Sequence, residues 1–321
     1  MRIVCAIALG VMAACSAPDA APSRDIAEGG QGVTPLGVQM DPRTPTAAEE
    51  ARIRSADDAL AEAPDSLELM LEAASAREAV WRYSEAVALY RQAAVGRPDD
   101  WRLPLGMGHR LIRLRRSGEA LAALERALAL DPEGFNAHYL LGLARYIRGD
   151  HPGAVEVYQA CFDLAAAGGA ESPEGDPRTC RDVANDPASR VALTSWMYRA
   201  LRRAGRDDEA GRLVAAVSEG MEIPNRSAEL YAGSPIPPDD NTHYYLTLMF
   251  YRGLLSEEAV LSDPRVSEGQ WPTVAYGVAV HHLVEGDTAR AVQLLDSIAA
   301  QPYWARLGHV AAEADLLQIR P

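Results

Sequence analysis

The sequence predicts an all-α protein built as a solenoid of stacked helix pairs, and two spacing patterns support this prediction. Three alanines that open similar short motifs are evenly spaced along the chain: Ala86, Ala120 and Ala154. Three prolines repeat at the same interval: Pro64, Pro98 and Pro132. Each proline marks a point where a helix ends, because proline has no amide donor and clashes with the preceding turn. Two marks at one period indicate a repeated helix–turn–helix unit.

The residues around these marks resemble the tetratricopeptide repeat, whose period of about 34 residues equals this interval. The stretch 81–93, with the pattern Trp-x-Tyr-x-x-Ala-x-x-x-Tyr-x-x-Ala, is similar to the second helix of that family. Leu141-Gly142, with Gly149 and Ala154, is similar to the opening of the next copy. The resemblance implies a right-handed superhelical solenoid of about six helix pairs that ends on a C-terminal capping helix. Such a pair cannot bury its apolar face alone, so stability has to come from stacking.

The predicted parts follow one another in a defined order. Residues 16–45 contain Pro, Ala, Ser and Gly with few large apolar side chains, and burial of such a segment does not offset the entropy of ordering it. The expected parts are a signal peptide over 1–14, a lipidated cysteine and disordered tether over 15–45, an N-terminal capping helix over 46–66, three regular repeats over 67–167, an insert loop over 168–190, and degenerate repeats with a C-terminal cap over 191–321, interrupted by a second insert over 222–241.

The amino terminus is typical of a targeting segment. An apolar run over 3–12 follows a positively charged start and is too short to span a bilayer as a mature helix. Met12-Ala-Ala-Cys15 resembles the bacterial lipobox, so Cys15 is the expected lipidation site, although Met12 replaces the usual leucine. The alternative is ordinary secretion with cleavage near Ala14 or Ala17. By resemblance, Ser16 predicts sorting to the outer membrane, with its periplasmic face as the location.

Composition excludes several classes of function. The formal net charge is −14, and all the basic side chains of the Lys and Arg class are arginine, since the sequence contains no lysine. A strongly acidic chain lacks the basic surface that neutralises phosphates, so general nucleic-acid binding is not expected. The lack of lysine also removes Schiff-base chemistry and the phosphate-binding lysine of a nucleotide loop.

No pattern predicts catalysis, a cofactor or a metal site. The sequence has no HExxH, GxSxG, SxxK or paired CxxC motif. His281 and His282 are adjacent, but neighbouring residues on a helix point about 100° apart, so the pair does not grip one metal. We therefore expect both histidines to be structural and the protein not to be an enzyme.

Cys161 and Cys180 are the two cysteines that remain after export, because Cys5 leaves with the signal peptide and Cys15 carries the lipid. An even pair in an oxidising compartment predicts a disulfide. The bridge would close a loop of about 20 residues and contribute on the order of 3 kcal/mol in the chain-entropy model. The alternative is two unconnected thiols, because Cys161 occupies a small-residue position that holds alanine in the earlier copies.

The resemblance also implies a binding groove. In the tetratricopeptide family, particular positions of each first helix face the concave side of the superhelix, and here they hold mainly arginine and tyrosine. Arginine and tyrosine dominate binding hot spots. The alternative is that arginine, as the available cation, lies on every solvated helix face. The expected groove residues are Arg102, His109, Arg113, Asn136, Tyr139, Tyr146, Arg199, Arg202, Arg203, Tyr244, Tyr251 and Arg252.

The order of lipobox, tether, repeats and cap is similar to that of the NlpI-type lipoproteins of Gram-negative bacteria. This resemblance implies a lipid-anchored, periplasm-facing scaffold that binds proteins or peptides and brings them to envelope enzymes of the protease or peptidoglycan-hydrolase type. The membrane is contacted only through the N-terminal lipid. The alternative is a peptide- or glycan-binding module that uses the concave groove and the 168–190 insert. Neither expectation fixes the oligomeric state.

Overall fold

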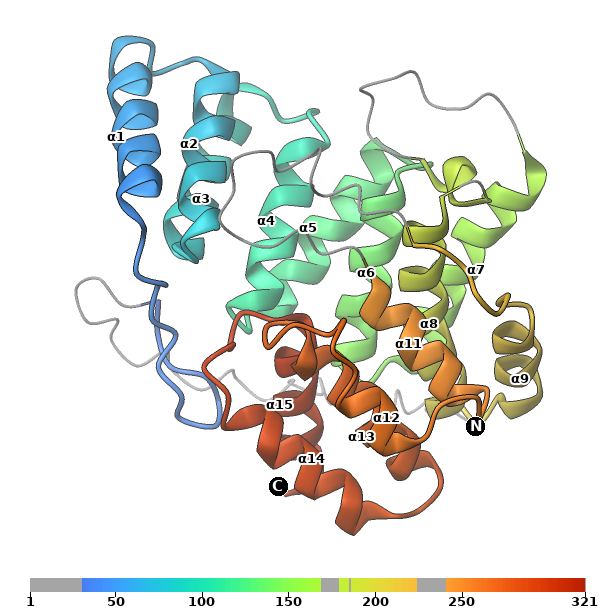
Figure 1. The fold of residues 1–321 in the computed structure, drawn as a ribbon. Coiled ribbons are helices and arrows are strands. Elements are labelled where there is room, and N and C mark those ends of the chain that lie inside the picture. The colour runs from blue at the N-terminus through green and yellow to red at the C-terminus, as the bar shows by residue number, and fades with distance from the viewer. Residues whose placement is uncertain (1–30, 169–178, 185, 224–240, 321) are drawn as a thin grey trace, which may run out of the picture.

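The fold is all-α, as the sequence predicts. A computed structural model describes residues 31–168, 179–184, 186–223 and 241–320, and these residues contain no β-strand (Figure 1). The helices are α1 Ala47–Glu62, α2 Leu67–Ala79, α3 Tyr83–Gly96, α4 Arg102–Arg113, α5 Ser117–Leu130, α6 Phe135–Ile147, α7 His151–Ala167, the 3-10 helix η1 Cys180–Ala184, α8 Pro187–Arg203, α9 Asp207–Ala215, α11 Thr242–Tyr251, α12 Glu257–Leu261, α13 Trp271–Val284, α14 Thr288–Ala299 and α15 Leu307–Ile319.

Consecutive helices pack as pairs, and each pair stacks on the next. The helices of the described residues form six pairs, which are α2–α3, α4–α5, α6–α7, α8–α9, α11–α12 and α13–α14, and α15 follows the last pair. Figure 1 shows α1 at one end of the array, with α15 returning beside α4. The prediction of about six helix pairs with a C-terminal capping helix is therefore confirmed.

Glycine and a large side chain face each other where the two helices of a pair meet. A Cβ atom at Gly108 would lie 2.4 Å from Leu124, and one at Gly142 would lie 2.3 Å from Tyr158. The second glycine and its partner occupy the same positions in their repeat as the first two do in theirs. Real Cβ contacts are never this short, so the helices approach closely only because these positions lack a side chain. The alanines that mark the repeat are fully buried beside them.

The turn between the two helices of each repeat uses a left-handed residue. Trp81, Arg115 and Gly149 occupy equivalent positions in successive repeats and have φ of 63°, 58° and 82°. Glycine adopts this conformation freely, whereas it costs other residues roughly 1–2 kcal/mol. Two of the three regular repeats therefore hold a strained residue at a position that suits glycine.

The prediction that residues 15–45 form a disordered tether is wrong for residues 31–45, which are ordered. Residues 33 and 39 form an antiparallel bridge, and Met40 is buried in the core. The side chain of Gln31 donates to the carbonyl of Trp81 and accepts from the amide of Ser84 at 2.9 Å. Polar residues order this segment because the first two repeats offer backbone partners, which a composition argument does not include. Residues 1–30, which hold the signal peptide and Cys15, lie outside the described residues.

The N-terminal helix begins at a capping box. The hydroxyl of Thr46 accepts from the amide of Glu49 at 3.3 Å, and the carboxylate of Glu49 accepts from the amide of Thr46 at 2.8 Å. Arg43 forms an ion pair with the same carboxylate and donates to the carbonyl of Ala79 at 2.8 Å. Arg43 thus links the start of α1 to the end of α2, which is consistent with the expected role of α1 as a cap on the first repeat.

Candidate functional site

The predicted groove residues lie on α4, α6, α8 and α11, the first helices of four successive repeats, except Arg252, which directly follows α11. The structure does not bring them together on one solvated surface. It divides them into a charged group on α4, an aromatic group in the core, and a set of ion-paired arginines on α8 and α11.

On α4, His109 lies between two arginines. Its Nδ1 is 3.0 Å from Nη1 of Arg110, and its Nε2 is 2.9 Å from Nη2 of Arg113. Burial, followed by the charges of Arg113 and Arg110, holds the pKa of His109 well below its usual value of 6.5. The imidazole is therefore neutral beside the two cations. Glu78 of α2 forms an ion pair with Arg110.

The beginnings of α4 and α6 carry the residues that remain accessible. Arg102 is held by Asp100 at 2.7 Å and by Glu68 at 3.1 Å, with 38% of its side chain exposed. Asn136, the second residue of α6, is exposed, and Tyr139 is half-buried one turn later. We use the term inner face for the side of the first helices that the sequence predicts to line the groove. The part of it formed by Arg102, Asn136 and the half-buried Tyr139 is called the open half of the inner face.

Three predicted tyrosines take part in buried hydrogen bonds between repeats. The hydroxyls of Tyr139 and Tyr244 lie 2.9 Å apart, and Nε1 of Trp196 donates to both, at 3.0 and 3.2 Å. The hydroxyls of Tyr276 and Tyr146 lie 3.0 Å apart. Tyr146 and Tyr244 are buried, so their expected place in an open groove is wrong. Tyr146 packs against Trp196 of α8 and Tyr276 of α13, and the hydroxyl of Tyr244 bonds to Tyr139 of α6 and Trp196 of α8.

Arg199 is fully buried, and the expectation that it faces solvent is wrong. Its guanidinium lies 4.5 Å from the ring centroid of Trp196, and its Nε donates to the hydroxyl of Tyr251 at 3.0 Å. Tyr251 in turn donates to the carbonyl of Gly277 at 3.1 Å. The pattern of the first helix predicts the side of α8 on which Arg199 lies, but α13 packs against that side.

The other predicted arginines of α8 and α11 are mostly buried and form ion pairs. Arg202 binds Glu285 at 2.6 Å, and Arg252 binds Glu219 at 3.2 Å. Arg203 binds Asp315 at 3.0 Å, with 16% of the arginine side chain exposed. These side chains hold helices of different repeats together, so the expectation that they form a free basic surface is also wrong.

The C-terminal segment lies against the first repeats. The ring of Trp304 meets the rings of Trp81 and Tyr83 edge-on, with centroids 5.7 and 5.8 Å apart. Its Nε1 donates to the carbonyl of Asp41 at 2.9 Å. Arg113, a predicted groove residue, donates to the carbonyl of Ala305. The inner face of α4 is thus already in contact with the chain's own end.

Arg115 forms a buried ion pair with α15. Its Nε lies 2.8 Å from Oε2 of Glu313, and both side chains are almost entirely buried. Arg115 is also one of the two strained turn residues, and the other, Trp81, contacts Trp304. Both non-glycine residues at this turn position therefore bind the C-terminal segment. These contacts stabilise two residues whose backbone conformation is strained.

Together these contacts cover the C-terminal ends of α4 and α6. A pocket of about 280 Å³ lies between these helices, where Ile112, Ala144 and Ile147 face Val310 and Leu317 of α15. The charged side chains of Arg115 and Glu313 also line it. The covered half of the inner face is thus an internal interface, and the open half is the part that a partner can reach. Sequence reasoning missed the covering residues, although Glu313 and Asp315 are conspicuous acidic residues in the largely apolar stretch 307–319.

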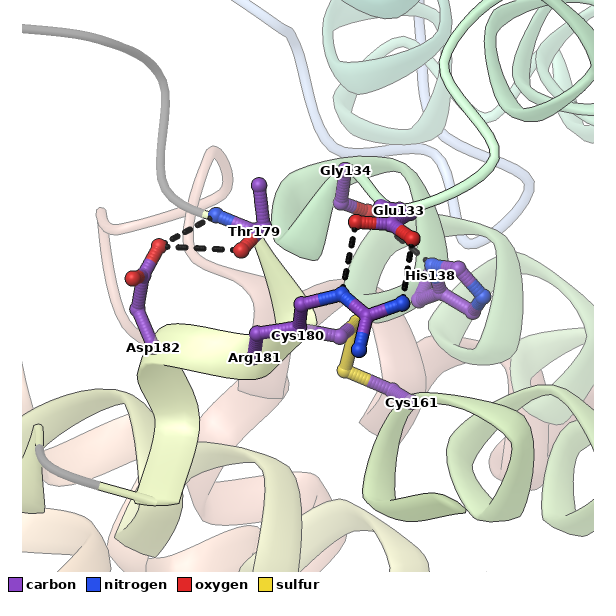
Figure 2. Close-up of a disulfide and its surroundings, with 8 residues drawn as sticks. All are labelled: Glu133, Gly134, His138, Cys161, Thr179, Cys180, Arg181 and Asp182. Atoms are coloured by element: carbon purple, nitrogen blue, oxygen red, sulfur yellow. Dashed lines mark hydrogen bonds and ion pairs between the residues drawn. A yellow bond between two sulfur atoms is a disulfide. The ribbon is translucent and has the colours of Figure 1, made fainter. Parts of the chain in front are cut away.

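The predicted disulfide between Cys161 and Cys180 is present (Figure 2). It joins α7 to η1, and both cysteines are fully buried. Residues 169–178 of the predicted insert lie outside the described residues, but its end at 179–184 is bound to the start of the third repeat. One potential metal-ligand cluster occurs in the described part of the chain, and it consists of these cysteines and His138. Among the described helices, none has the length and apolarity that a membrane crossing requires.

Comparison with known proteins supports the repeat assignment over part of the chain. The family model described as tetratricopeptide repeat matches residues 105–168. No curated protein matches the chain. A solved structure titled "Structure of Naa15/Naa10 bound to HypK-THB" is similar at 16% sequence identity with a TM-score of 0.31, over 85% of this chain and 52% of that one. The matched region spans about half the length of that chain. Tetratricopeptide repeats are generally scaffolds for protein contacts rather than enzymes.

Proposed function

We propose that this protein is a lipid-anchored scaffold that binds protein partners through the open half of its inner face. One observation carries the proposal: residues 304–319 cover one half of that face, whereas Arg102 and Asn136 are accessible and Tyr139 is half-buried on the other half. Arginine and tyrosine on a rigid concave surface are the residue types that dominate protein binding. Their helices are fixed by the repeat stack, so little entropy is lost when a partner binds.

The anchor and the location are further parts of the proposal. The lipobox-like motif at Cys15 supports attachment to the periplasmic face of the outer membrane, with membrane contact through the lipid alone. The order of parts supports partners among cell-envelope enzymes of the protease or peptidoglycan-hydrolase type. The protein itself supplies no catalytic group in this role, and the net charge of −14 disfavours nucleic acid.

Site-specific photocrosslinking in cells tests the proposal. A photoreactive amino acid is placed at Asn136 on the open half, and in a matched variant at Glu125, which is exposed on the outer helix α5. We expect the Asn136 variant to capture envelope proteins and the Glu125 variant to capture none of them. Equal capture from both positions, or none from Asn136, would contradict binding through the open half.

The second candidate function is a peptide- or glycan-binding module that uses the groove and the 168–190 insert. An extended peptide running along the groove requires the inner faces of successive repeats, and α15 and Trp304 cover those faces at the ends of α4 and α6. The scaffold therefore ranks first. A thermal shift on addition of glycans or peptides, without protein capture at Asn136, would reverse this ranking.

A further inference from the structure

His138, Cys161 and Cys180 come together from three different elements. One potential ligand atom from each lies within 4.8 Å of the others, and all three residues are buried. His138 is on α6, Cys161 on α7 and Cys180 in η1, so the cluster joins the third repeat to the segment that follows it. Figure 2 shows His138 and the disulfide beside the start of η1.

Contacts other than the disulfide hold Cys180 in this place. Its amide donates to the carbonyl of Glu133 at 2.7 Å, and residues Gly134 and Thr179 form an antiparallel bridge next to it. The guanidinium of Arg181 binds both carboxylate oxygens of Glu133, at 2.9 and 2.6 Å. These bonds do not depend on the sulfur atoms. Cleavage of the disulfide therefore leaves two thiols near each other and near the imidazole.

The imidazole of His138 is neutral, and one of its two nitrogens keeps a lone pair. Its Nδ1 lies 3.0 Å from the carbonyl oxygen of Gly134, which can only accept, so Nδ1 carries the proton. Nε2 then keeps its lone pair. Burial lowers the pKa of His138, so the ring stays neutral. A histidine that donates its other ring N–H to a backbone carbonyl is the usual arrangement in metal sites.

We propose that the reduced protein binds Zn²⁺ through His138, Cys161 and Cys180, and that the disulfide closes this site. One nitrogen and two thiolate ligands suit zinc, which takes sulfur at about 2.3 Å and imidazole nitrogen at about 2.0–2.1 Å in a tetrahedral arrangement. The fourth position belongs to a water molecule. Thiolates favour Zn²⁺ over the hard cations Mg²⁺ and Ca²⁺.

The exchange between the two states is balanced. A dithiol reductant transfers two electrons and two protons to the disulfide, which becomes two thiols while the reductant becomes a cyclic disulfide. Zn²⁺ then displaces one proton from each thiol, and both protons go to solvent. The covalent link between α7 and η1 is replaced by a metal link between the same two elements, with α6 added.

Cobalt binding provides the test, because Co²⁺ replaces Zn²⁺ and absorbs light when bound by thiolate. The full chain carries Cys5→Ser and Cys15→Ser, so that Cys161 and Cys180 are the cysteines that remain. We expect the protein reduced with a dithiol to take up one Co²⁺ with a thiolate-to-metal charge-transfer band, which Zn²⁺ abolishes. The oxidised protein should show no band. If the reduced protein keeps its helical circular dichroism but shows no band, the proposal is wrong.

Two variants separate the histidine from general metal binding. His138→Gln should weaken Co²⁺ binding by at least about tenfold. His151→Gln, on α7 and about 15 Å along the helix from Cys161, should leave it unchanged. Equal weakening in both variants, or in neither, would overturn the assignment of His138. If His138→Gln does not fold, protection decides: Zn²⁺ should shield both thiols of the reduced parent protein from alkylation, and unprotected thiols would overturn the site.

Discussion

The guanidinium of Arg203 on α8 and the carboxylate of Asp315 on α15 form two parallel hydrogen bonds, each 3.0 Å long. The same carboxylate accepts from the hydroxyl of Tyr276 at 2.9 Å. Only 7% of the Asp315 side chain is exposed. This pair joins helices that are 112 residues apart in the chain and closes the superhelix onto its own C-terminal helix.

Removing one member of this pair should strongly destabilise the protein. Arg203→Gln leaves the carboxylate of Asp315 buried without its cation, and such a change costs roughly 3–5 kcal/mol. Denaturant unfolding measures the loss. The double variant Arg203→Gln/Asp315→Asn should recover part of it, because no charge is then left buried.

The matched control for Arg203 is Arg190→Gln on the same helix. Arg190 is exposed, and surface substitutions of this kind change stability by about 0.5 kcal/mol or less. Equal losses for Arg190→Gln and Arg203→Gln would mean that the ion pair to Asp315 does not hold α15 in place.

The disulfide should stabilise the third repeat without being needed for helix formation. Its loop spans 19 residues, and reduction should lower the free energy of unfolding by on the order of 3 kcal/mol in the chain-entropy model. Far-ultraviolet circular dichroism should hardly change, since each repeat stacks on its neighbours independently of this link. Mass mapping should recover the Cys161–Cys180 peptide from oxidised protein, and two free thiols there would refute the link.

The neutral state of His109 predicts a pH dependence of stability. Its pKa in the folded protein is lowered by burial and by Arg113 and Arg110, whereas in the unfolded chain it returns to about 6.5. Below about pH 6.5 His109 binds a proton in the unfolded chain but not in the folded protein. The free energy of unfolding therefore falls as the pH drops. His109→Gln should therefore lose less thermal stability than the parent protein between about pH 7 and about pH 5. Parallel melting curves for the two proteins would contradict this reading of His109.

The anchor prediction concerns Cys15. Cys15→Ala removes the expected lipidation site, so we expect the protein in the soluble fraction or unprocessed. Membrane fractionation with a salt wash measures this, and Cys5→Ser is the control because Cys5 lies inside the predicted signal peptide. A Cys15→Ala protein that stays tightly bound to the membrane after the wash would rule out lipidation as the anchor.

The helix pairs were predictable from the sequence because their causes lie within one repeat. Gly108 and Leu124 meet across one turn, and the same pairing recurs in the next repeat. The environment of the inner face was not predictable in this way. Arg115 meets Glu313 across 198 residues. A repeat pattern contains no information on a contact between such distant residues. The pattern therefore predicted which side of each helix faces inward, but not which residues cover that side.

The arginines of the inner face should separate into two classes on substitution. Arg102 is partly exposed, and an exposed ion pair contributes up to about 1 kcal/mol, so Arg102→Gln should keep the fold. If the open half binds a partner, this variant should reduce crosslinking from Asn136. Unchanged crosslinking would mean that Arg102 takes no part in binding.

Arg199 should behave in the opposite way. Arg199→Glu places an anion among buried aromatic rings and should unfold the protein. Arg199→Met keeps much of the volume, and Nη1 and Nη2 of Arg199 have no hydrogen-bond partner among the described residues. Replacing a buried charge by an apolar side chain of similar size is often neutral or stabilising, so the Met variant should retain the melting temperature of the parent protein. An Arg199→Glu variant that folds and melts like the parent protein would contradict the burial of Arg199 between α8 and α13.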